Sequence, residues 1–149
     1  MRAVVERVKS ASVYVGGCEV SQIGGGLLVL LGIAASDDGD DIRYIVDKTI
    51  NLRIFEDNAH KMNRSLTDTG GQIMLVSQFT LMGDARKGRR PGFSNAASPQ
   101  DAEPVYQRVI EEYKRAGANI STGIFQADMQ VEHVNDGPVT ILLDSKKAF

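Results

Sequence analysis

The sequence predicts a single α+β domain over residues 1–149, made mostly of β-sheet with two main helices. A chain of 149 residues is the size of one ordinary domain with a core of its own. Runs rich in Val, Leu and Ile recur between glycine turns, which is typical of strands. Only two segments change to helical spacing, without the regular βαβ alternation of a doubly wound fold.

The N-terminal part of the chain has the pattern of a β-meander. Strand-like runs cover residues 2–15, 18–23 and 26–33, and glycine pairs and triplets separate them as turns. The run 27–33 is almost wholly apolar, which is typical of a strand buried on both faces.

Two segments have the signature of amphipathic helices. In residues 37–53 apolar side chains recur at helical spacing, and acidic residues crowd the first turn, where the helix dipole favours them. The second helix has Ser98 as its N-cap and Pro99 at its first position, and Gly117 ends it.

The remaining segments predict further strands and loops. A polar loop over 56–71 precedes a strand over 73–81, and an irregular stretch rich in Gly, Arg and Lys follows as a long functional loop. Two more strands, over 122–134 and 138–144, flank residues 135–137, whose composition is that of a hairpin turn.

Composition narrows the class of protein. The 17 Lys and Arg against 19 Asp and Glu argue against a general nucleic-acid coat protein, although a local basic cluster can still steer a polyanion. The single cysteine, Cys18, predicts a reducing compartment. The sequence contains no Cys/His cluster with the spacing of a zinc site, so we expect no metal. No organic cofactor is implied either. Charged or polar residues interrupt every apolar run, so we expect a cytoplasmic protein without a membrane segment or signal peptide.

The end of the strand at 73–81 is the first candidate site. Its polar and aromatic residues are Ser77, Gln78, Phe79 and Thr80. Thr80 could act as a nucleophile or position water, Gln78 could bind a carbonyl, and backbone N–H groups there could form an oxyanion hole. Ser and Thr at element ends ordinarily satisfy backbone groups, so the local sequence alone favours a structural role.

A basic cluster follows in the long loop and is the second candidate. It places four cations in five residues: Arg86, Lys87, Arg89 and Arg90. Such density suits phosphate contacts, although charge runs are frequently only solvated surface.

The third candidate is the run from Asn135 to Thr140, which contains Gly137-Pro138. As a hairpin connection it needs no function. A cis Gly137–Pro138 bond would instead make successive carbonyls project to one side as a rigid acceptor pair. The histidines, His60 and His133, lie far apart in the sequence, and a structural role is favoured for both.

These three segments in this order, with the opening run 1–8 and the run 24–32, resemble the D-aminoacyl-tRNA deacylase family over essentially the whole chain. The motifs S-Q-F-T-L and N-x-G-P-V-T are specific together, whereas each alone would be weak. The resemblance implies a largely antiparallel or mixed sheet with a barrel-like core, and a homodimer without a cofactor. It also implies hydrolysis of the ester that joins a D-amino acid to the 3′-terminal ribose of a tRNA.

The resemblance implies roles for individual residues as well. Ser77, Gln78, Phe79 and Thr80 would line the pocket for the ester, with backbone N–H groups near Phe79 binding the developing oxyanion. A cis Gly137-Pro138 from one subunit would enter the partner's site, bind the α-amino group and reject L side chains. Such a pocket would also admit glycyl-tRNA, because glycine has no side chain to reject.

Three further residues complete this expectation. Phe125 and Met129 would pack on the terminal adenine. Arg7 would brace the Gly-Pro segment, and Glu6, which stands where the family pattern has Gln, is expected to compete for Arg7.

Thr80 has no visible base to activate it, so we expect it to position the substrate, while backbone groups and the vicinal hydroxyl of the tRNA carry the chemistry. Two rival functions stay open on the residues alone. One is a non-catalytic RNA-binding module, supported by the basic cluster and a few aromatic residues. The other is a hydrolase of a small ester or amide, which would leave the basic cluster without a phosphate to contact.

Overall fold

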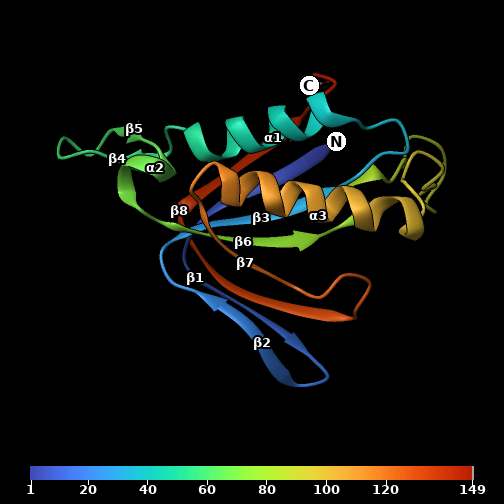
Figure 1. Ribbon diagram of the computed structural model, residues 1–149, viewed down its shortest axis with the longest axis horizontal. Helices are drawn as coiled ribbons and strands as arrows, with labels where there is room; N and C mark the ends of the chain where they lie inside the picture. The colour runs from blue at the N-terminus through green and yellow to red at the C-terminus, as the bar shows by residue number, and fades with distance from the viewer. Residues whose placement is uncertain (149) are drawn as a thin grey trace.

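The computed structural model describes residues 1–148. A mixed sheet curves into a nearly closed, barrel-like shape, and helices α1 (Gly39–Asn51) and α3 (Pro99–Arg115) lie side by side over one face of it (Figure 1). The predicted α+β fold with two main helices is confirmed. None of the helices formed by residues 1–148 is long and apolar enough to cross a membrane.

The first strand, β1 (Arg2–Val15), is the centre of the antiparallel part of the sheet. Its first half pairs with β3 (Gly26–Gly32) and its second half with β2 (Cys18–Ile23). On its other side β1 pairs along its whole length with the last strand, β8 (Met129–Asp144). The two ends of the chain are therefore joined in one long ladder.

The other part of the sheet is parallel. Strand β6 (Gln72–Ser77) lies between β3 and β7 (Asn119–Thr122) and runs parallel to both. Helix α1 lies in the connection from β3 to β6, and α3 lies in the connection from β6 to β7. Parallel strands end at the same edge of a sheet, so the residues that follow β3, β6 and β7 come together there.

Capping residues fix where the two helices begin. Asp38 and Asp41 form a capping box at α1, and the Ser98 hydroxyl accepts from the Asp101 N–H at the start of α3. Both helices turn an apolar stripe to the sheet, where each fully buried large side chain stabilises the fold by roughly 1.5–3 kcal/mol. The buried helix residues of this core include Ile42, Ile45, Val46, Ala102, Tyr106, Val109, Ile110 and Tyr113.

Three predicted segments differ from the structure. The strand predicted over 122–134 is instead the end of β7 at Thr122, a loop, and the first part of β8, which begins at Met129. The strand predicted over 73–81 ends at Ser77 and is followed by a short 3-10 helix, η1 (Phe79–Met82). The segment predicted as a polar loop contains the short strands β4 (Phe55–Glu56) and β5 (Met62–Arg64) and one turn of helix, α2 (Leu66–Thr69). These elements are too short to give a periodic pattern.

The predicted hairpin at residues 135–137 is wrong. Glu6 pairs with Thr140 and Val8 pairs with Asn135, so both sides of the Gly-Pro segment pair with the same strand in the same direction. Four residues of β8, 136–139, stand opposite the single residue Arg7. The Gly-Pro segment is therefore a bulge that projects from one continuous strand, and not a reversal of the chain.

Candidate functional site

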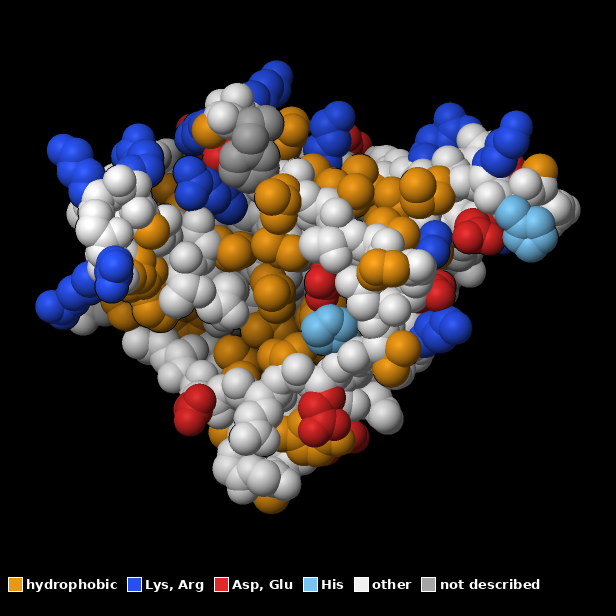
Figure 2. Space-filling view, turned by 180° about the vertical axis from the view of Figure 1, so that it is seen from behind, with side chains coloured by type: hydrophobic (Ala, Val, Ile, Leu, Met, Phe, Trp, Pro, Cys, Tyr) orange, Lys and Arg blue, Asp and Glu red, His pale blue; other side chains and the backbone are white. Residues whose placement is uncertain are grey.

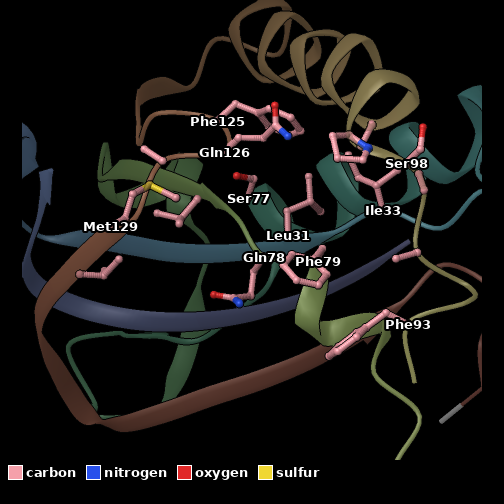
Figure 3. Close-up of a pocket in the computed structure, with 17 residues that line it drawn as sticks. Leu31, Ile33, Ser77, Gln78, Phe79, Phe93, Ser98, Phe125, Gln126 and Met129 are labelled. Carbon is pink, nitrogen blue, oxygen red and sulfur yellow. The ribbon is translucent and has the colours of Figure 1, made fainter. Parts of the chain in front are cut away.

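A cavity of about 670 Å³ opens at the carboxyl ends of β3 and β6, beside the N-terminus of α3. This is the edge where ligands bind in many parallel sheets. Figure 3 shows Ser77, Gln78 and Phe79 between Phe125 and Met129 on one side and Phe93 on the other. Its lining consists of Leu31, Ile33, Val76, Ser77, Gln78, Phe79, Phe93, Ala96, Ala97, Ser98, Pro99, Ala102, Phe125, Gln126, Ala127, Met129 and Val131.

The backbone after β6 is held firmly against β3. The Gln78 N–H donates to the Leu31 carbonyl at 2.7 Å, and η1 then begins at Phe79. A Cβ at Gly32 would lie 2.9 Å from Leu81 Cβ and 3.0 Å from the Gln78 carbonyl oxygen, so only glycine lets η1 approach this closely. The first N–H groups of η1, those of Phe79 and Thr80, have no acceptor within the short helix and remain available to a ligand.

Aromatic rings frame the cavity. Phe79 is 59 % exposed, and its ring meets the Phe93 ring edge-on with 5.1 Å between centroids. Across the cavity, the Phe125 ring lies 5.6 Å from the ring of Tyr106, whose hydroxyl donates to the Leu75 carbonyl at 2.8 Å. Burial raises the pKa of Tyr106, so this hydroxyl stays protonated and anchors the wall.

None of the lining residues carries an ionisable side chain, and the polar ones are Ser77, Gln78, Ser98 and Gln126. Within residues 1–148 no cluster of His, Cys, Asp or Glu could hold a metal ion. A cavity of this kind can bind a neutral acyl group and an aromatic base, and can stabilise an oxyanion through backbone N–H groups.

Three side chains with possible proton chemistry lie outside this lining. Thr80 is exposed, and its Oγ1 accepts a hydrogen bond from Gln78 Nε2. His60 pairs with Glu56 on the β4–β5 side of the molecule, and His133 pairs with Glu6 on β1. Both histidines therefore have structural partners.

The Gly137–Pro138 peptide bond is cis, and both residues are exposed. Neither lines the cavity of its own chain. Gly137 has a φ of +128°, and a Cβ there would lie 2.8 Å from Arg7 Nη2. Glycine is therefore required at this position by both backbone conformation and space.

The expectation that Glu6 competes for Arg7 is wrong. Arg7 donates from Nε to the Asp136 carbonyl and from Nη1 to the Ile54 carbonyl. Glu6 instead accepts hydrogen bonds from side chains of β8. Because neighbouring residues of a strand point to opposite faces of the sheet, the two side chains do not meet.

The basic cluster lies in the exposed loop between Asp84 and Gly92, whose backbones exchange hydrogen bonds of 2.8 and 2.9 Å. Arg86 is folded back onto Asp84, with Nε–Oδ1 and Nη2–Oδ2 distances of 2.9 and 2.6 Å. This pair holds the pKa of Asp84 well below its usual range. In the described part of the chain, the other three cations of the cluster have no ion-pair partner within 4.0 Å.

The structure thus brings Ser77, Gln78, Phe79, Phe125 and Met129 to one cavity. Thr80, which is expected from the sequence to line the same pocket, is not among the lining residues. It places Arg7 and Gly137-Pro138 together at a second location, and the basic cluster at a third. Sequence reasoning did not assign Phe93 and Gln126 to the site. Phe93 lies in the irregular loop, where no periodicity marks it, and the sequence offered no signal for Gln126.

Comparisons with known proteins show the family to which the chain belongs. The family model described as D-Tyr-tRNA(Tyr) deacylase matches residues 4–144. A protein of Clostridioides difficile (strain 630) named D-aminoacyl-tRNA deacylase is 56 % identical over 149 residues, which is all of both chains. One from Symbiobacterium thermophilum with the same name is 54 % identical, over 100 % of this chain and 99 % of the other.

A solved structure similar to this chain is the c-Myc DNA Unwinding Element Binding Protein. Its TM-score is 0.93 and its identity 44 %, with 97 % of this chain and 98 % of that chain covered. The similarity therefore extends over the whole fold described above.

Proposed function

Because the chain belongs to the D-Tyr-tRNA(Tyr) deacylase family, we propose that its cavity holds the 3′ end of a D-aminoacyl-tRNA with the ester over η1. The chain is an enzyme that hydrolyses D-aminoacyl-tRNA. Water adds to the ester carbonyl, the bond to the ribose oxygen breaks, and free D-amino acid and tRNA are released. Aminoacyl-tRNA is used in the cytoplasm, and we place the enzyme there.

The observation that carries the mechanism is the absence of ionisable side chains among the residues that line the cavity. The N–H groups of Phe79 and Thr80 would bind the oxyanion that develops on the ester carbonyl. The vicinal hydroxyl of the terminal ribose would move the proton, since an aminoacyl ester is already activated. Ser77 and Gln78 would orient the acyl group, and Thr80, held by Gln78, would position it rather than attack it.

Chirality selection would come from Gly137 and Pro138 of a second subunit. Their exposure, their absence from the cavity of their own chain and the rigid anchoring of the bulge support this assignment. Figure 2 shows hydrophobic side chains gathered across the middle of the sheet face opposite the helices, and Val134 and Leu142 of β8 are 52 % and 59 % exposed. A twofold partner on this face would bury them and form the homodimer.

The terminal adenine and the phosphates of the tRNA would contact two other groups of residues. Phe125 and Met129 would pack on the terminal adenine, because an aromatic ring and a thioether suit the face of a base. Lys87, Arg89 and Arg90, exposed and without ion pairs in the described part of the chain, would contact tRNA phosphates. Arg86 would first have to leave Asp84.

The first test is a deacylation time course with D-tyrosyl-tRNA and L-tyrosyl-tRNA, in chelator, for the wild type and Pro138→Ala. Rapid loss of the D ester alone, with weaker discrimination in the variant, is the expected result, and glycyl-tRNA should also be cleaved. Equal rates for the D and L esters in the wild type would refute chirality selection. A Thr80→Ala variant that binds substrate but has lost all turnover would show that this hydroxyl carries the chemistry.

The same time course tests the non-catalytic alternative, which is supported by the basic cluster and by the name of one solved relative, the c-Myc DNA Unwinding Element Binding Protein. A nucleic-acid-binding module would bind tRNA in a salt-sensitive manner without cleaving either ester. The family and the curated relatives favour the enzyme.

A further inference from the structure

The carboxylate of Glu6 lies next to the Gly137-Pro138 bulge and contacts three side chains of β8. His133 Nε2 lies 2.8 Å from Glu6 Oε2. On the other carboxylate oxygen, Oε1, Thr140 Oγ1 donates at 3.1 Å and Asn135 Nδ2 donates at 3.3 Å. Glu6 therefore contacts β8 on both sides of the bulge.

Glu6 and Arg7 hold the bulge from opposite faces of the sheet. Arg7 points toward the helices, where it reaches the Ile54 and Asp136 carbonyls. Glu6 points to the other face, on which its cross-strand partner Thr140 also lies. The residues between Asn135 and Thr140 are thus fixed by two adjacent residues of β1, Glu6 from one face of the sheet and Arg7 from the other.

The contact with Glu6 determines how Asn135 is oriented. A carboxylate accepts hydrogen bonds and cannot donate them, so Asn135 must present its NH₂ group to Glu6 and Thr140. Its Oδ1 then faces the other way and accepts the Val139 N–H at 2.9 Å. Val139 follows Pro138 directly, so a chain of contacts leads from Glu6 through Asn135 to the backbone of the Gly-Pro segment.

His133 completes the arrangement. The Glu6 side chain is only 17 % exposed and the His133 side chain 30 %, so their contact is shielded from water on most sides. A hydrogen bond to an ionised carboxylate is about twice as strong as one between neutral groups. His133 occupies Oε2 and leaves Oε1 to Asn135 and Thr140.

We propose that Glu6 and His133 are positioning residues for chirality selection, which together fix the direction in which Gly137 and Pro138 present their backbone. The inference rests on the proposed function of the Gly-Pro segment. It adds two residues that touch no substrate and act through Asn135.

The test compares Glu6→Ala, Glu6→Gln, His133→Ala and the Glu6→Ala/His133→Ala double variant in the whole chain of 149 residues. The readouts are KM and kcat for D-tyrosyl-tRNA and for L-tyrosyl-tRNA, and the midpoint of thermal unfolding. Glu132→Ala is the matched control, because it removes an exposed carboxylate beside His133 that makes no side-chain hydrogen bond in the described part of the chain. Pro138→Ala reports on the proposed function itself.

We expect Glu6→Ala to lower the ratio of D to L kcat/KM by about tenfold, because a charge-assisted hydrogen-bond network is lost. The change should appear as a higher KM for the D ester and a measurable rate on the L ester. Glu6→Gln should recover most of the ratio, since its carbonyl oxygen can still accept from Asn135 and Thr140. The double variant should be no worse than Glu6→Ala, and Glu132→Ala should match the wild type.

A D to L ratio that stays at the wild-type value in Glu6→Ala, while Pro138→Ala lowers it, would overturn the inference and leave the proposed function intact. Rates that fall equally for both esters, together with a lower unfolding midpoint, would also overturn it, because they indicate a purely structural role. Equal rates on both esters in the wild type, or an unchanged ratio in Pro138→Ala, would refute the proposed function and the inference with it.

Discussion

Arg7 donates a hydrogen bond from Nε to the carbonyl oxygen of Asp136 at 3.0 Å, and its Nη1 reaches the carbonyl oxygen of Ile54 at 2.5 Å. The arginine is only 6 % exposed. One side chain of the first strand thus ties the bulge of the last strand to the segment that follows α1. Removing it would leave two carbonyl groups without their donors.

Arg7→Ala should therefore destabilise the protein by about 3 kcal/mol and loosen the Gly-Pro segment. Urea denaturation measures the first effect, and the D to L rate ratio measures the second. Arg7→Lys is the matched variant: its single ammonium group can reach one carbonyl but lacks the planar fork that reaches both, so it should recover only part of each loss. Full discrimination in Arg7→Ala would show that the arginine serves stability alone.

Gly137→Ala should lower the D to L rate ratio by more than its loss of folding stability alone would explain. The added Cβ would lie 2.8 Å from Arg7 Nη2 and 2.9 Å from Val139 Cγ2, at a φ of +128°. We expect a loss of about 1–3 kcal/mol from backbone strain and a displaced bulge. Gly17→Ala is the control, because Gly17 has a φ of +80° with nothing within 4 Å of a Cβ. It should lose stability without changing the D to L ratio.

Gly32→Ala tests whether the position of η1 governs the rate. A Cβ there would lie 2.9 Å from Leu81 Cβ and 3.0 Å from the Gln78 carbonyl oxygen, so η1 must move away from β3. Since the N–H groups of Phe79 and Thr80 move with it, kcat for the D ester should fall by about 10²-fold, as for the loss of one oxyanion donor. Gly25→Ala, with nothing within 4 Å of its Cβ, should keep the wild-type kcat.

Arg89→Ala/Arg90→Ala should weaken binding of whole tRNA without affecting the chemistry. Each lost phosphate contact reduces the dependence of log K on log salt by about 0.9. The KM for D-tyrosyl-tRNA should rise and become less sensitive to salt, while the rate on a short D-aminoacyl-adenosine should not change. A parallel loss on both substrates would show that the loop shapes the cavity instead.

The parts of the fold that the sequence predicted well are those with local signals. The strands from Arg2 to Gly32 have their own apolar pattern and glycine turns, and both helices have caps and stripes within a few residues. The site at Ser77 to Phe79 was found because polar residues follow an apolar strand. These signals require no knowledge of distant parts of the chain.

The bulge could not be predicted in the same way. Asn135-Asp136-Gly137 has the composition of a hairpin turn. Only the residues that its flanks pair with show that the segment is a bulge and not a turn. Those partners are Glu6 and Val8, at the other end of the chain. For the same reason the sequence could not indicate that Glu6 faces His133 while Arg7 faces the helices.

Asp41 should account for part of the acid sensitivity of the fold. Its side chain is 4 % exposed and pairs with Lys146 at 2.7 Å. Burial alone would raise the pKa of this carboxyl, but hydrogen bonds from Lys146, Ser145 and the Asp38 backbone outweigh it and lower the pKa from 3.8 to about 2. The unfolded chain therefore takes up a proton at a higher pH than the folded one.

The contribution of Asp41 is accordingly complete above about pH 4 and is lost as the pH falls toward 2. Asp41→Asn should lose about 1–2 kcal/mol at pH 7 and show a shallower decline of stability between pH 4 and 2. Urea denaturation at pH 7 and pH 3 measures both, with the exposed Asp128→Asn as control. If Asp41→Asn declines as steeply as the wild type, the acid sensitivity comes from other carboxylates, and the contact between Asp41 and Lys146 adds nothing to it.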